Sequence, residues 1–102
     1  MGARALIALA LVAACAGPRP SVSVVAVAPS PQPGHERVTL AVRNAGGHGE
    51  IELAITLRGH DGSVVRDART LDLDAGQRVV VAIDVAAPPG EYAAAASALY
   101  PD

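Results

Sequence analysis

The 102-residue chain has one cysteine, two tyrosines, and no phenylalanine, tryptophan or lysine. With a single thiol the chain cannot form an internal disulfide, so its fold must depend on a hydrophobic core. Two aromatic rings are too few for the stacking platforms that sugar-binding and single-strand-binding proteins use. Because like charges never follow one another for more than a residue or two, we also expect no basic membrane patch and no nucleic-acid partner.

The one cysteine, Cys15, ends an apolar N-terminal segment. Arg4 supplies a basic tip, and residues 5–14 are all Ala, Leu, Ile or Val, which is the layout of a secretory signal. At about 1.5 Å per residue, a helix of this length would cover about half of the ~30 Å hydrocarbon core. The segment therefore predicts export followed by cleavage, and not a membrane span.

Two cleavage sites fit this signal. Val12-Ala13-Ala14-Cys15 resembles the lipobox of bacterial lipoproteins, whereas Ala14-Cys15-Ala16 fits the ordinary A-x-A pattern with cutting before Gly17. We favour the lipobox because it directly follows the apolar run and uses an unpaired thiol. The resemblance implies a diacylglyceryl thioether on Cys15, and two or three acyl chains anchor a protein stably. The same resemblance implies the outer membrane if the cell is Gram-negative, because Ala16 is not the aspartate that in many such species signals retention at the inner membrane.

The rest of the chain is long enough for one small domain. We assign residues 1–14 to a lipoprotein signal peptide, residues 15–20 to a lipidated tether, and residues 21–102 to the domain. Without the signal peptide, seven arginines stand against ten aspartates and glutamates, so the net charge is −3.

Beyond the tether, apolar residues recur at every second position, which is typical of half-buried strands. The first strand would place Val22, Val24 and Ala26 on one face. The last is rich in alanine, yet the turn signal Pro88-Pro89-Gly90 before it favours a strand over a helix. Six strands are expected, near residues 21–28, 38–43, 50–58, 64–73, 78–85 and 91–100. The regular short spacing predicts an all-β antiparallel sandwich of the immunoglobulin type, with a seventh strand if 64–73 is split into two.

The turn signatures then resemble those of a known family. They are Pro31-x-Pro33-Gly34 before a strand, residues 38–46 (VTLAVRNAG), the turn Asp61-Gly62, residues 74–77 (DAGQ), and residues 88–92 (PPGEY). Their order resembles the bacterial immunoglobulin-like CARDB domains, the cell-adhesion-related domains of bacteria, and the related FxLYD domains share its middle part. The resemblance implies an extracytoplasmic, non-enzymatic module, usually found within larger surface proteins.

Tyrosine and histidine are the first candidates for a functional site. Tyr92 follows Gly90 by two residues, as in immunoglobulin-type tyrosine corners, so we expect its hydroxyl to bond to the backbone. His35 and His60 fall in connections at one end of an up-and-down sandwich, and His48 falls at the other end. This placement excludes a three-histidine metal site, and a pair would lack the further ligands that zinc needs. Solvent-exposed loop histidines are therefore expected.

Serines and carboxylates give no clear catalytic pattern. None of the serines lies in a G-x-S-x-G elbow or beside a histidine in sequence. The serines concerned are Ser21, Ser23, Ser30, Ser63 and Ser97. Alternation predicts that the carboxylates of Glu50, Glu52, Asp72, Asp74 and Asp84 face water. Asp72 and Asp74 could gather with Glu50 and bind calcium, although no loop has the ligand density of a dedicated site. We expect no catalytic residue, no metal and no cofactor.

Two surfaces could receive a partner. One is an uncharged outer face, which would be formed by Val80, Ala82, Ala93 and Ala95 or by their neighbours. Alternating strands also bring the tether, loop 44–49 and the C-terminus to one end, facing the membrane. Loops 29–35, 59–62 and 86–90 would then point away from it.

These observations predict a lipid-anchored immunoglobulin-like module for protein interaction or scaffolding in the bacterial envelope. Its anchor is Cys15, which places it on the extracytoplasmic side of a membrane, and its partner is an envelope protein. The alternative is an accessory or ligand-binding lipoprotein with a weak calcium or small-molecule site.

Overall fold

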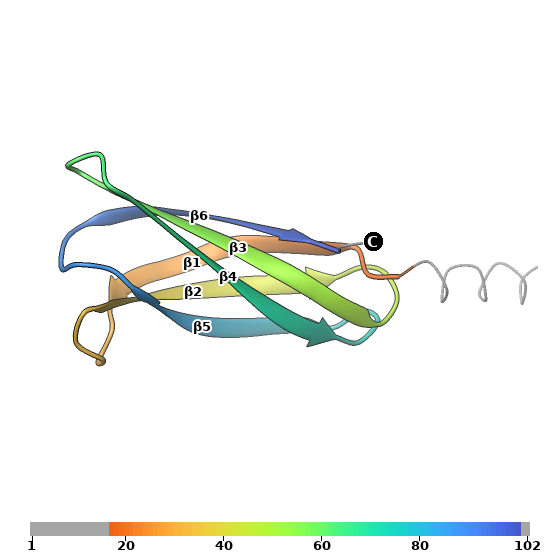
Figure 1. The fold of residues 1–102 in the computed structure, drawn as a ribbon. Coiled ribbons are helices and arrows are strands. Elements are labelled where there is room, and N and C mark those ends of the chain that lie inside the picture. Colours follow the sequence, from red (N-terminus) through yellow and green to blue (C-terminus); the bar gives the residue numbers. More distant parts are fainter. Residues whose placement is uncertain (1–16, 101–102) are drawn as a thin grey trace, which may run out of the picture.

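The fold consists of six antiparallel strands in two sheets (Figure 1). It is seen in a computed structural model that describes residues 17–100, so Cys15 and the expected signal peptide lie outside the described residues. The strands are β1 (Pro20–Pro29), β2 (His35–Asn44), β3 (Gly49–Gly59), β4 (Val64–Leu73), β5 (Arg78–Ala86) and β6 (Tyr92–Leu99). The all-β prediction is confirmed, β4 is a single strand, and the alanine-rich segment is a strand.

Each sheet has three strands, in the orders β1-β2-β5 and β4-β3-β6. Every hydrogen-bonded pair is antiparallel. In immunoglobulin domains the first, second and fifth canonical strands, A, B and E, are neighbours, and strand C pairs with strand F. Here β1, β2 and β5 correspond to A, B and E, while β3 and β6 correspond to C and F. The observed order is therefore that of an immunoglobulin-type sandwich.

The core lies between the two central strands, β2 and β3. Their alternation is strict, because in each strand every second side chain is buried. Aliphatic side chains alone fill this space, without the tryptophan that centres antibody domains. The most buried members are Val38, Leu40, Val42, Ile51, Leu53, Ile55, Leu57, Leu73 and Val85.

One expected face is wrong at the end of β1. The pairing of β1 with β2 shifts between Val24 and Ala26, which is the signature of a β-bulge. A bulge inserts one extra residue and so reverses the facing of the residues that follow it. Val22, Val24 and Val27 therefore pack against the core, while Ala26 is exposed.

The two open sides of the sandwich differ. On one side β1 runs beside β6, although the two are not hydrogen-bonded (Figure 1). On the other side, Asp67 and Arg69 take two core-facing positions of β4 and pair with each other at 2.9 Å. Arg69 Nη2 also donates to the carbonyl oxygen of Asp84 on β5 at 3.2 Å. Inward-facing charges of this kind hinder the pairing of an edge strand with another chain.

The strand directions define two ends of the domain. We call the end with Gly17, the turn 45–48, the turn 74–77 and Tyr100 the proximal end. The end with the connections 30–34, 60–63 and 87–91 is the distal end. This division agrees with the arrangement expected from six alternating strands.

Candidate functional site

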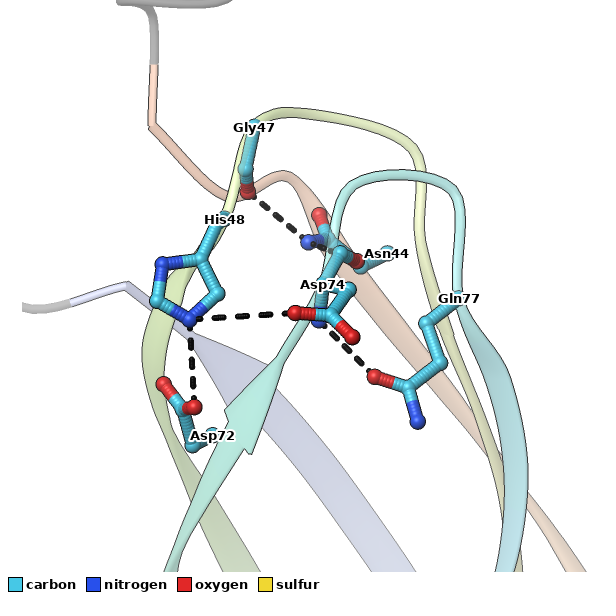
Figure 2. A network of polar contacts seen from close by, with 6 residues as sticks. All are labelled: Asn44, Gly47, His48, Asp72, Asp74 and Gln77. Atoms are coloured by element: carbon cyan, nitrogen blue, oxygen red, sulfur yellow. Dashed lines mark hydrogen bonds and ion pairs between the residues drawn. The ribbon is translucent and has the colours of Figure 1, made fainter.

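The proximal end is organised around the side chain of Asn44 (Figure 2). This side chain is fully buried. Its Oδ1 accepts hydrogen bonds from the backbone nitrogens of Arg19 at 3.0 Å and Gly46 at 2.9 Å. Its Nδ2 donates to the carbonyl oxygens of Gly47 at 2.8 Å and Asp74 at 3.0 Å. One amide therefore joins three separate segments, and both of its donors and its acceptor are used.

Residues 17–19, which were expected to belong to the tether, pack on the domain. The carbonyl oxygen of Gly17 accepts from Gly47 N at 2.7 Å, and that of Arg19 accepts from Ala45 N at 3.0 Å. Pro18 is buried between them, beside Gly49. The chain is thus fixed to the sandwich from Gly17 onward, two positions after Cys15.

His48 and two aspartates form the polar surface of this end (Figure 2). The imidazole Nε2 of His48 lies 3.1 Å from Asp72 Oδ2 and 3.9 Å from Asp74 Oδ1. Glu50 is the cross-strand partner of Asp72. Asp72, Asp74 and Glu50, which the sequence allowed to gather, do lie at one end, but residues 17–100 contain no group of three or more ligands placed to hold a metal ion.

At the distal end, Tyr92 forms the expected corner. It begins β6, and its hydroxyl donates to the carbonyl oxygen of Pro88 at 2.6 Å. The backbone nitrogen of Ala87 donates to the carbonyl oxygen of Gly34 at 3.0 Å. Together with the fixed φ angles of two prolines, these bonds constrain the backbone of the 87–91 connection.

Two hollows share Pro89 and Gly90 of this connection in their lining. The first has a volume of about 350 Å³ and lies between the 59–63 and 88–92 segments; its apolar lining includes Val65 and Tyr92. At its rim, His60 Nε2 lies 3.0 Å from Glu91 Oε2. Hydrogen bonds from the Ser63 side chain and backbone lower the pKa of Asp61 in the same rim. The second hollow, of about 230 Å³, lies on the other side of Pro89 and Gly90.

Glu36 lines the second hollow and was not singled out from the sequence. It is only 4% exposed and occupies the inward-facing set of β2. Alternation with Val38 and Leu40 could have identified it, because it places a carboxylate on the core side of a strand. His35, next to it, lies in the same hollow, and its Nδ1 is 3.0 Å from the carbonyl oxygen of Pro33.

The other candidate residues are spread over the surface. Four of the five carboxylates expected to face water are exposed, and Asp84 is partly shielded by an ion pair with Arg37. The Arg37 guanidinium is the main reason that the pKa of Asp84 is lowered. The hydrogen bonds of the described chain join none of the expected serine hydroxyls to a histidine. Val80, Ala82, Ala93 and Ala95 are exposed, as expected.

Comparisons with known proteins identify no relative. No family model, no curated protein and no solved structure matches the chain. The resemblance to CARDB and FxLYD domains therefore remains a prediction. Within residues 17–100, no helix is long and apolar enough to cross a membrane.

Proposed function

We propose that the chain is a lipid-anchored, extracytoplasmic module that binds a protein of the bacterial envelope through its distal end. The anchor is the thioether on Cys15, as the lipobox pattern predicts. In this proposal the domain performs no catalysis, holds no cofactor, and belongs with the CARDB-type modules that its turn signatures resemble.

The observation that supports a distal binding surface is the set of hydrogen bonds and prolines that constrain the 87–91 connection. A loop held by the Tyr92 hydroxyl, by the bond from Ala87 to Gly34 and by two prolines loses little entropy on binding. It separates two hollows, one with an apolar lining and one with the carboxylate of Glu36. A partner segment with an apolar side chain followed by an N–H donor would complement both.

The position of Gly17 supports the direction of display. Gly17 is bonded to Gly47 at the proximal end, whereas the two hollows lie about one strand length away. For a strand of ten residues this is about 30 Å. An anchor on Cys15 would therefore leave the distal connections clear of the lipid surface.

The anchor is tested first, by mass spectrometry of the protein extracted from the envelope. An N-terminal Cys15 carrying acyl chains is expected, and an unmodified chain beginning at Gly17 would refute the anchor.

The distal surface is tested by site-specific photo-crosslinking in the native envelope. A crosslinking residue at Asp61 is expected to capture one reproducible protein, and the same residue at Ala75 in the proximal turn serves as the control. Pro89→Ala and Glu36→Gln should reduce the capture at Asp61. Equal capture at both ends, or none at Asp61, would contradict a distal interface.

The alternative ligand-binding function predicts a rise in melting temperature with calcium, because binding to the folded state alone adds RT ln(1 + [L]/Kd).

A further inference from the structure

The outer face of the β1-β2-β5 sheet carries an unusual pair of charges at its proximal end. Arg43 on β2 and Arg78 on β5 are direct cross-strand partners, and both side chains are exposed. Like charges directly opposite one another destabilise a sheet. Neither guanidinium has an ion pair with any residue between 17 and 100. This arrangement favours an anion bound from outside the domain.

A shallow hollow of about 510 Å³ lies beside the two arginines. Ser21 and Ser23 of β1 line it together with Arg43 and Arg78. Guanidinium groups and hydroxyls are the donors that phosphate oxygens accept best. On the side away from the proximal end, Val80 borders the hollow with 67% of its surface exposed. The site therefore offers donors for a phosphate next to an apolar surface.

No acidic side chain on this face competes for the arginines. The only carboxylate among its outward-facing residues is Asp84, which Arg37 already holds through bonds of 3.0 and 3.2 Å. The proximal part of the opposite sheet instead exposes Glu50, Glu52 and Asp72. The proximal end is thus basic on one face and acidic on the other.

The lipid anchor would bring this basic face to a bilayer. Gly17 is fixed at the same end of the molecule, and two residue steps of 3.8 Å put the Cα of Cys15 within about 8 Å of the Cα of Gly17. We infer that the hollow between Arg43, Arg78 and Ser21 binds the phosphate groups of anionic phospholipids in the membrane that carries the anchor. This inference rests on the proposed lipidation of Cys15.

Binding at this site tilts the domain on its anchor. The β1-β2-β5 sheet then faces the headgroups near its proximal end, and the acidic sheet faces away. The sequence predicts no basic patch because its arginines are scattered, yet the sheet register places two of them side by side. Each arginine near an anionic surface changes the equilibrium about 5-fold, so two change it about 25-fold. That is too little to recruit a free domain but enough to orient a tethered one.

The orientation can be measured on the lipidated full chain in vesicles. Acylated Cys15 leaves an introduced cysteine as the only free thiol. Ala82→Cys, on the outer face of β5, and Ala68→Cys, on the outer face of β4, are both exposed and carry the same fluorophore. The readout is quenching by a headgroup-labelled lipid, in phosphatidylcholine vesicles with and without phosphatidylglycerol.

With phosphatidylglycerol, the probe at position 82 should be quenched several-fold more than the probe at position 68. Arg43→Gln with Arg78→Gln should remove the difference, as should high salt. Arg58→Gln with Arg66→Gln removes the same charge from the outer face of the other sheet and should leave the difference unchanged.

The other outcomes each refute the inference. Equal quenching at the two positions, or a difference that persists without anionic lipid, overturns it. Binding of inorganic phosphate to the domain, together with no difference in quenching in phosphatidylglycerol vesicles, identifies a site for soluble phosphate instead. If the probe at position 82 becomes more shielded from solvent as the protein concentration rises in detergent, the face binds a second copy of the chain instead of lipid. If the chain carries no acyl groups and does not float with vesicles, the proposed anchoring fails. A protein that floats but shows equal quenching at the two positions refutes the phospholipid site alone.

Discussion

The clearest test of the fold is the removal of the Asn44 side chain. Its amide makes four hydrogen bonds, all to backbone groups of three different segments. A hydrogen bond contributes about 1 kcal/mol, and buried groups left unpaired add to the loss, so Asn44→Ala should lower the free energy of unfolding by about 4 kcal/mol. A domain of this size has about 4 to 13 kcal/mol in total. The variant therefore loses between about a third of this stability and all of it, depending on where the domain lies in the range.

Urea denaturation of the detergent-solubilised full chain, followed by far-ultraviolet circular dichroism, measures this change. His48→Ala is the matched control, because His48 lies in the same turn with an exposed side chain. It should cost less than about 0.5 kcal/mol, as exposed substitutions usually do. A cost below about 1 kcal/mol for Asn44→Ala would mean that water replaces the amide, and the reasoning would be wrong.

Asn44→Asp separates the donors of the amide from its acceptor. The carboxylate can still accept from Arg19 and Gly46, but it directs a second oxygen at the carbonyl oxygens of Gly47 and Asp74. Burial and these two carbonyls should raise the pKa of the introduced carboxyl above its unfolded value. Its charged form is then the destabilising one, so the loss of stability should shrink as the pH falls through the raised pKa. A loss independent of pH would contradict this account.

Three further changes test other parts of the structure. Arg37→Gln removes the main cause of the lowered pKa of Asp84, so NMR titration should show that pKa rising. Asp84 stabilises the fold above its unfolded pKa, and this contribution is lost as the pH falls through its lowered folded-state pKa. Arg37→Gln should therefore make this contribution smaller. Tyr92→Phe removes the bond to Pro88; it should cost about 1 kcal/mol and speed amide exchange in the 87–91 connection. Leu53→Ala opens a cavity in the core and should cost about 2 to 5 kcal/mol by urea denaturation.

Most of the fold could be predicted from the sequence because short-range patterns of apolar and turn residues determine it. Apolar residues at every second position identify β2 and β3, where each inward residue is buried. Glycine marks the turns that need a positive φ, as at Gly62 (+86°) and Gly76 (+74°). The prediction of a strand at β6 was correct despite its alanine content, because Pro88 and Pro89 form a turn signal just before it.

What the sequence could not provide depends on register. The bulge after Val24 has no local signal, since valine and alanine fit either face of a strand equally well. Arg43 and Arg78 are far apart in sequence and become neighbours only because β2 pairs with β5 in one particular alignment. Asn44 was assigned to a loop, although alternation after Val38, Leu40 and Val42 places it in the buried set. The two ends of the sandwich, by contrast, follow from strand count alone.

The proximal amide network also links stability to orientation. Asn44 holds Arg19, and Gly47 holds Gly17, so the direction in which the chain leaves the domain is fixed relative to the sheet that carries Arg43. A flexible exit would let the domain rotate about its anchor, and the basic face would meet the lipid only part of the time. Asn44→Ala should therefore reduce the difference in quenching between positions 82 and 68 at temperatures where the variant is still folded. A difference that survives this substitution would show that the arginines orient the domain without help from the exit segment.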